Sequence, residues 1–279
     1  MKLEPVTLYE FECGEMRGYL RGGGPAPGIE IAAAGEGRAL TPAGGGIFRL
    51  SHYLSDVTVG PEAALEAPGR SEELSGQLLS VRFPPSAQWP VDALVDFTLI
   101  EEGAIDIEFT FSFRQGIGSF EAQVVSAFAE GIPAAYVHVG GEWFRPALRA
   151  KEICFFSRDE PAAALIQSGR WDFYLERGYN VILDDRGYDY PLLVHQDDKS
   201  GWALVQMMIT DECPALSICS APMQHNFSLV GRGAGAGEEI TCHARLIYAQ
   251  FGGLDSILPV YHKFVREVRG GQFAAARRG

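Results

Sequence analysis

The chain has 279 residues, of which 47% are hydrophobic and 21% charged, a balance that is typical of folded globular proteins and excludes extensive disorder. Its formal net charge of -13 disfavours binding to nucleic acid or to an anionic membrane surface, because both require clustered Lys and Arg side chains. Neutral small molecules such as sugars remain compatible partners, although acidity often serves solubility alone.

The cysteines and the start of the chain indicate a cellular location. The five cysteines are an odd number without a CxxC pair, and Cys154, Cys219 and Cys242 lie among apolar residues. Buried free thiols of this kind are typical of a reducing cytosol. The first residues contain no apolar run of signal-peptide length, and no segment is apolar for long enough to span a membrane. We therefore expect a soluble, cytoplasmic protein.

The first part of the chain is predicted to form short strands joined by turns rich in Gly, Ala and Pro, over residues 5–20 and 22–46. Residues 47–59, IFRLSHYLSDVTV, then alternate in a way that places His52 on the apolar side of a strand. A lone histidine in that position is more often a hydrogen-bonded core residue than a catalytic one, and both interpretations stay open.

Residues 92–128 carry the strongest pattern in the sequence. In AIDIEFTFSFR (104–114), apolar and polar residues alternate strictly, which predicts a strand with one buried face. Residues 95–99 alternate in the same way, residues 101–103 supply a hairpin turn, and residues 120–124 begin another strand. We predict a three-stranded antiparallel meander.

The segment VDFTLIEEGAIDIEFTFSF (95–113) resembles the central hairpin of the galactose mutarotase-like (aldose epimerase) proteins. The resemblance implies an all-β fold, an antiparallel β-supersandwich with its sugar site on a concave sheet. In that family the next strand carries an Asn-His-Ser-aromatic-Phe motif whose His is the catalytic acid. Here the strand reads VVSAFAE (124–130), in which Ser126 and Phe128 match but Val125 occupies the position of the His. Since an aliphatic side chain donates no proton, we expect slow or absent mutarotation.

Residues 134–146, AAYVHVGGEWFRP, have a composition that suits a sugar site. If one strand runs through Gly140 and Gly141, His138 and Glu142 share a face, and Trp143 and Arg145 follow. An aromatic ring stacks on pyranose C–H groups, while Arg and Glu bind hydroxyls. A surface hairpin with an Arg–Glu pair is equally compatible with the pattern.

Two later stretches contain further candidates. PLLVHQDDKSGWALVQMM (191–208) predicts a hairpin with its turn at residues 197–201, and places His195 near the end, where ligand and solvent have access. Imidazole titrates near neutral pH, which suits proton transfer. Residues 220–233 are predicted to include a loop with adjacent His225 and Asn226, a fair place for a polar ligand. We expect His195 to meet at least one of His52 and His225 in a pocket with an aromatic wall, formed by Trp143 or Trp202.

The chain is predicted to end in one helix, over residues 254–268, capped by Asp255 or Ser256 and with Pro259 in its first turn. We expect one domain over residues 1–270 and a flexible tail over residues 271–279. The predicted fold is therefore an all-β, antiparallel β-supersandwich with a single C-terminal helix.

Two classes of function remain open. The first is a carbohydrate-active enzyme, an epimerase, isomerase or lyase, that transfers a proton at a sugar carbon. The second is a non-catalytic carbohydrate-binding or structural β-sandwich protein. A metal site of several histidines with Glu142 is a distant third, because no two histidines have ligand spacing. We expect no cofactor, and a homodimer stays open. The candidate catalytic residues are His52, His138, His195 and His225, and the candidate substrate contacts are Glu142, Trp143, Arg145, Asp197, Trp202 and Asn226.

Overall fold

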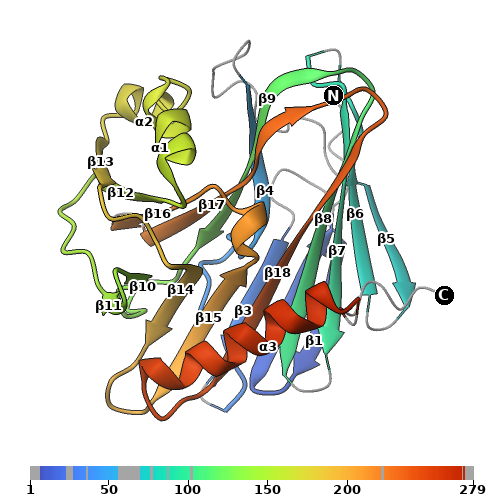
Figure 1. Ribbon diagram of the computed structural model, residues 1–279. Coiled ribbons are helices and arrows are strands. Elements are labelled where there is room, and N and C mark those ends of the chain that lie inside the picture. Colours follow the sequence, from blue (N-terminus) through green and yellow to red (C-terminus); the bar gives the residue numbers. More distant parts are fainter. Residues whose placement is uncertain are drawn as a thin grey trace.

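A computed structural model describes residues 7–22, 28–35, 37–55, 70–75, 78–86, 88–100, 103–220, 223–271 and 273. Strands account for 55% of it and helices for 13%, so the prediction of an all-β fold is confirmed. Figure 1 shows two large sheets packed against each other, with helices on their outer sides. No helix in the described ranges is long and apolar enough to cross a membrane.

The larger sheet has nine strands. They are β5 (Arg70–Ser75), β6 (Leu78–Phe83), β7 (Val91–Ile100), β8 (Ala104–Phe113), β10 (Tyr136–Val139), β11 (Glu142–Phe144), β14 (Tyr190–Gln196), β15 (Trp202–Met208) and β18 (Glu239–Gln250). Their order across the sheet is β11-β10-β14-β15-β18-β8-β7-β6-β5. The predicted 191–208 hairpin is present as β14 and β15, with Asp197 accepting hydrogen bonds from the backbone of Lys199 and Ser200 in the turn.

The second large sheet has six strands, and a third sheet has three. The six-stranded sheet has the order β13-β12-β16-β17-β9-β4, and the three-stranded sheet has the order β1-β2-β3. The six strands are β4 (Arg49–Ser55), β9 (Ile117–Ala127), β12 (Glu152–Ser157), β13 (Asn180–Asp184), β16 (Ala215–Ser220) and β17 (Met223–Ala234), and the three are β1 (Thr7–Cys13), β2 (Met16–Gly22) and β3 (Gly28–Ala33).

Strict alternation in β8 sets the two faces of the nine-stranded sheet, as predicted. Ile105, Phe109 and Phe111 are fully buried in the core between the sheets, whereas Asp106 and Glu108 point to the opposite face. The preceding turn is fixed by Gly103, which has a positive φ of 82°. Residues 101 and 102 of that predicted turn lie outside the described ranges.

The predicted three-stranded meander is wrong in its third strand. β7 and β8 pair as expected, but β8 pairs on its other side with β18, and β9 belongs to the six-stranded sheet. Phe120 of β9 packs edge-on against Phe113 of β8 from across the core, with ring centroids 4.9 Å apart. Alternation shows that a strand has a buried face, but it does not show which sheet supplies the strand's neighbour.

The outer face of the nine-stranded sheet is covered by the C-terminal helix. The 3₁₀ turn η3 (Leu254–Ile257) leads into α3 (Leu258–Arg269), which lies across the sheet in Figure 1. Pro259 is in the first turn, as predicted, but Asp255 and Ser256 are in the 3₁₀ turn and cap nothing. The predicted helix start was early because a 3₁₀ turn and an α-helix share the same start signals.

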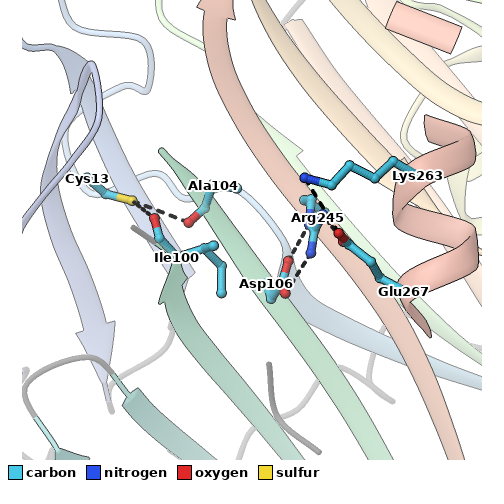
Figure 2. Close-up of polar contacts among 7 residues, drawn as sticks. All are labelled: Cys13, Ile100, Ala104, Asp106, Arg245, Lys263 and Glu267. Atoms are coloured by element: carbon cyan, nitrogen blue, oxygen red, sulfur yellow. Dashed lines mark hydrogen bonds and ion pairs between the residues drawn. The ribbon is translucent and has the colours of Figure 1, made fainter. Parts of the chain in front are cut away.

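An ion-pair cluster fastens α3 to the sheet (Figure 2). Arg245 of β18 donates two hydrogen bonds to the Asp106 carboxylate, at 2.5 and 2.9 Å, and a third to Glu267 of α3, at 2.7 Å. Lys263 approaches the same Glu267 carboxylate at 3.6 Å from the helix surface. Phe273 is also buried, against Phe264 of α3, so this part of the predicted flexible tail is packed; residues 272 and 274–279 lie outside the described ranges.

The three-stranded sheet is joined to the nine-stranded sheet at the β7–β8 turn. The Cys13 thiol donates to the carbonyl oxygens of Ile100, at 3.1 Å, and Ala104, at 3.3 Å, as Figure 2 shows. The five cysteines are buried and unpaired in disulfides, as the sequence predicted for Cys154, Cys219 and Cys242.

Two short helices cover the outer face of the six-stranded sheet (Figure 1): α1 (Glu160–Gln167) and α2 (Phe173–Glu176). The Asp159 carboxylate caps α1 by accepting from the backbone N–H of Ala162, at 2.9 Å. Trp171 and Tyr174 from this region are buried against Phe155 of β12. These side chains therefore close the part of this face that lies over β12.

Candidate functional site

The candidate residues lie in three separate places. His195 and His225 meet in the interior between the two large sheets, with Asp197 and Trp202 at the adjoining hairpin end. His138, Glu142, Trp143 and Arg145 lie on the β10–β11 hairpin. His52 and Asn226 lie on the outer face of the six-stranded sheet.

His195 and His225 form a buried pair that bridges the two sheets. Their Nε2 atoms are 2.8 Å apart, their rings are stacked, and Phe128 packs against both. The Nδ1 atom of His195 is 2.6 Å from the Pro133 carbonyl oxygen, and that of His225 is 2.9 Å from the Gln224 carbonyl oxygen. All four ring nitrogens are therefore engaged by the protein itself.

The contacts of this pair require more protons than two neutral rings carry. Both carbonyl oxygens only accept, so both Nδ1 atoms must donate, and the Nε2–Nε2 contact needs a proton of its own. Two neutral rings carry only two protons, so one of the three contacts lacks its hydrogen unless the pair takes up a third proton and with it one positive charge. Burial opposes that charge, lowering the pKa of His195 to about 4 and that of His225 well below its ordinary range. The pair has no free nitrogen with which to act on a substrate.

The pocket beside His195 is too small for a sugar ring. It is lined by Trp202 and Tyr248, whose rings stack with centroids 5.0 Å apart, together with Arg38, Asp197 and His195. Its volume is about 70 Å³, whereas small-molecule sites usually have about 300–1,000 Å³. The fold thus brings His195 and Trp202 to one pocket. His195 is buried, however, so the prediction that it lies on an accessible rim is wrong.

The β10–β11 hairpin differs from the single strand considered for residues 134–146. Gly140 and Gly141 have positive φ values of 60° and 84° and form the turn. Val139 therefore pairs with Glu142, and His138 pairs with Trp143. His138 shares its face with Trp143 and not with Glu142, because a turn reverses the chain.

His138 forms a hydrogen-bonded pair with a carboxylate that the sequence did not reveal. Its Nδ1 atom is 2.8 Å from Asp189 Oδ2, and the same oxygen accepts from the backbone N–H of Gly141, at 2.7 Å. The Nε2 atom has no hydrogen-bond partner among the described residues, yet it is not one of the enclosed polar atoms, so it reaches solvent. This arrangement can hold a proton-accepting imidazole in one orientation.

Aromatic rings surround the His138–Asp189 pair. The rings of Trp143 and Tyr190 each lie with centroids 5.2 Å from that of His138. Trp143 Nε1 donates to Asp255, at 3.0 Å, which joins the hairpin to the turn before α3. Both Glu142 and Arg145 are exposed, and the Arg145 guanidinium lies over the Tyr136 ring at 5.2 Å, so no Arg145–Glu142 pair forms in this described hairpin.

The remaining candidates lie on the outer face of the six-stranded sheet. Arg49 and Asn226 flank Val125 on neighbouring strands, and His52 pairs with Gln123. Burial, followed by the positive charges of Arg177 and Arg49, lowers the pKa of His52 to about 4. Val125 is buried here, so the position expected for a catalytic His is occupied by an enclosed aliphatic side chain.

No group of three or more His, Cys, Asp or Glu side chains in the described ranges could hold a metal ion. The histidines are instead separated into the three places above. Asp189, the residue that sequence analysis missed, lies 51 positions from His138. Asp189 becomes a neighbour of His138 only through the pairing of β14 with β10, which places Tyr190 opposite His138.

Comparison with known proteins identifies the fold but no close relative. No protein-family model and no curated protein matches the chain. Among solved structures, a Synechocystis protein aligns with a TM-score of 0.57, 8% identity and coverage of 90% of this chain and 98% of its own. The aldose epimerase homologue of C. elegans aligns with a TM-score of 0.55 and 8% identity, and the alignment covers 89% of this chain and 100% of that protein. A candidate aldose 1-epimerase of Escherichia coli aligns with a TM-score of 0.54 and 8% identity, and the alignment covers 88% of this chain and 100% of that protein. The chain therefore has the galactose mutarotase-like β-supersandwich fold.

Proposed function

We propose that the protein is a carbohydrate-active enzyme that transfers a proton at a sugar carbon, with His138 as the general base. The observation that carries the proposal is the 2.8 Å contact between His138 Nδ1 and Asp189, with Nε2 open to solvent. The names of the structural neighbours, an aldose epimerase homologue and a candidate aldose 1-epimerase, support carbohydrate as the substrate class.

The chemistry follows from the two ends of the imidazole. Nε2 of neutral His138 accepts a proton from an acidic C–H beside a carbonyl or carboxylate of the sugar, which leaves a carbanion or enolate. The Asp189 carboxylate accepts the Nδ1 hydrogen bond and stabilises the imidazolium that forms. Delivery of a solvent proton to the opposite face of this intermediate gives an epimer, return of the proton from His138 to the same face gives exchange alone, and loss of a leaving group gives a lyase product. The Trp143 ring supplies an apolar surface for the sugar.

The test is proton exchange into sugars in D₂O, followed by proton NMR for aldoses, ketoses and uronates. We expect loss of one C–H signal in at least one sugar, because the abstracted proton is replaced by deuterium. His138→Gln should lower the exchange rate by about 10²–10⁴-fold. Asp189→Asn keeps an oxygen to accept from Gly141 but removes the charge, and it should also lower the rate.

The matched control is His262→Gln, because His262 also contacts Tyr190, with ring centroids 5.3 Å apart, but lies on the exposed side of α3. This variant should exchange at the wild-type rate. Exchange that is unchanged in His138→Gln contradicts the proposal.

A second candidate function is non-catalytic carbohydrate binding. It is favoured by the buried Val125 and by the His195–His225 pair, whose nitrogens are all engaged. Sugar binding without deuterium exchange in any sugar supports this second function and excludes the first.

A further inference from the structure

The outer face of the six-stranded sheet contains a polar side chain that its surroundings do not satisfy. Gln123 of β9 is fully buried, and among the described residues neither its amide nitrogen nor its amide oxygen has a hydrogen-bond partner. Buried amides are nearly always paired in native proteins, with protein, water or ligand. An amide with both ends unpaired therefore indicates that a further polar group binds here.

The described polar neighbours of Gln123 form hydrogen bonds with one another and none with Gln123. Ser228, its partner on β17, donates to Glu121 at 2.7 Å, and Glu121 also accepts from Arg170 at 2.9 Å. On the same face, Asn226 donates its side-chain amide to Ser217, at 2.8 Å. These groups thus form hydrogen bonds that leave Gln123 out.

Arg49 lies on the same face and also lacks a partner among the described residues. Its side chain is half-buried, and it has no hydrogen bond or ion pair with any residue in the described part of the chain. Burial lowers the pKa of its guanidinium. Arg170 and Arg245, the buried arginines elsewhere in the described ranges, both pair with carboxylates. In a chain of net charge -13, a half-buried arginine without a carboxylate is an unmatched cation beside an unmatched amide.

The strand ladder places these groups together. In the pairing of β4 with β9, Arg49 is opposite Val125 and His52 is opposite Gln123, and directly opposed side chains share a face. Arg177, which follows α2, lies close enough to act on His52 together with Arg49. The Arg49 guanidinium and the Gln123 amide thus lie on one side of the sheet.

We propose that Arg49 and Gln123 bind the oxyanion group, a carboxylate or a phosphate, of a small organic anion on the outer face of the six-stranded sheet. A guanidinium presents parallel N–H donors that match either group, and the Gln123 amide supplies a further N–H donor. Val125, between Arg49 and Asn226, gives the site an apolar floor. The site is separate from the His138–Asp189 pair and does not depend on that pair being catalytic.

Isothermal titration calorimetry with four probes tests the proposal: glucuronate, glucose 6-phosphate, inorganic phosphate and neutral glucose. If the site binds carboxylates, glucuronate should bind at least tenfold more tightly than glucose. If it binds phosphates, glucose 6-phosphate and inorganic phosphate should both do so. Arg49→Gln should raise the Kd of that anion at least tenfold. Arg232→Gln, which makes the same charge change at an exposed arginine, should leave the Kd unchanged.

Gln123→Glu provides a second variant in case Arg49→Gln does not fold. It places a carboxylate of nearly the same shape beside Arg49, so it should raise the Tm of the ligand-free protein and abolish anion binding. The proposal is overturned if no anion binds, if glucose binds as tightly as the anions, or if Gln123→Glu binds the anion with the wild-type Kd.

Discussion

At the scale of single residues, the histidines divide according to whether they keep a free nitrogen. His195 and His225 have each nitrogen within 2.9 Å of another group, whereas His138 has Nδ1 on Asp189 and Nε2 open. The sequence could suggest that His195 and His225 meet, because His195 lies near a predicted hairpin end and His225 in a predicted loop, although the structure places His225 within β17. It could not show that their meeting consumes the very nitrogens that catalysis needs.

The lowered pKa of His195 predicts a stability that depends on pH. The unfolded ring binds a proton below its ordinary pKa of 6.5, whereas the folded ring stays neutral until about pH 4. The unfolded state therefore binds more protons between these values, and stability falls as pH falls through this window. Between pH 7 and pH 5 the expected loss from His195 is about 2 kcal/mol.

Urea unfolding of the wild type and of His195→Gln at pH 7 and pH 5 measures this contribution. The variant should be less stable at pH 7, because it loses the contact with His225, but its stability should fall less between the two pH values. An equal fall in both proteins would mean that His195 is protonated as readily when folded as when unfolded.

At the scale of elements, hydrophobic alternation correctly predicted which residues share a face of a strand, but it did not predict which strands are neighbours in a sheet. It correctly placed Asp106 and Phe109 on opposite faces of β8, but it assigned β9 to the wrong sheet. The reason is physical: alternation reports burial on one side of a strand, while sheet membership depends on contacts such as Phe113–Phe120 across the core. The β10–β11 turn was missed for a related reason, since Gly140 and Gly141 permit a turn without requiring one.

The ion-pair cluster under α3 yields a prediction for this element. Arg245→Ala leaves the Asp106 carboxylate, which is 1% exposed, buried without its bidentate partner. Breaking a buried pair by removing one member costs about 3–5 kcal/mol. Lys263→Ala removes the other cation beside Glu267, but Lys263 is half-exposed, so the loss should stay below about 1 kcal/mol.

Urea denaturation of both variants measures the two losses of stability. The comparison is matched, because Arg245 and Lys263 both pair with Glu267. A loss in Arg245→Ala as small as that in Lys263→Ala would show that α3 is held by the apolar contacts of Phe264 and Tyr261 alone.

At the scale of the whole molecule, the fold could be predicted from a short stretch and the candidate site could not. Residues 95–113 resemble one hairpin of the galactose mutarotase-like proteins, and structures of that kind align over 88–90% of the chain. The site depends instead on pairs such as His138 with Asp189 and Arg49 with Gln123, which only the strand register brings together. A fold tolerates such changes of chemistry, because function resides in particular side chains rather than in the architecture.

The central claim is that this chain has the β-supersandwich fold without the chemistry of mutarotation, because Val125 occupies the position of the expected acid. Polarimetry of freshly dissolved D-glucose and D-galactose with the purified protein tests it most directly. We predict interconversion of the anomers at the rate of buffer alone, since general acid–base help is typically worth about 10²–10⁴-fold and Val125 offers none. Catalysed interconversion of either sugar would contradict the claim and show that another residue donates the proton.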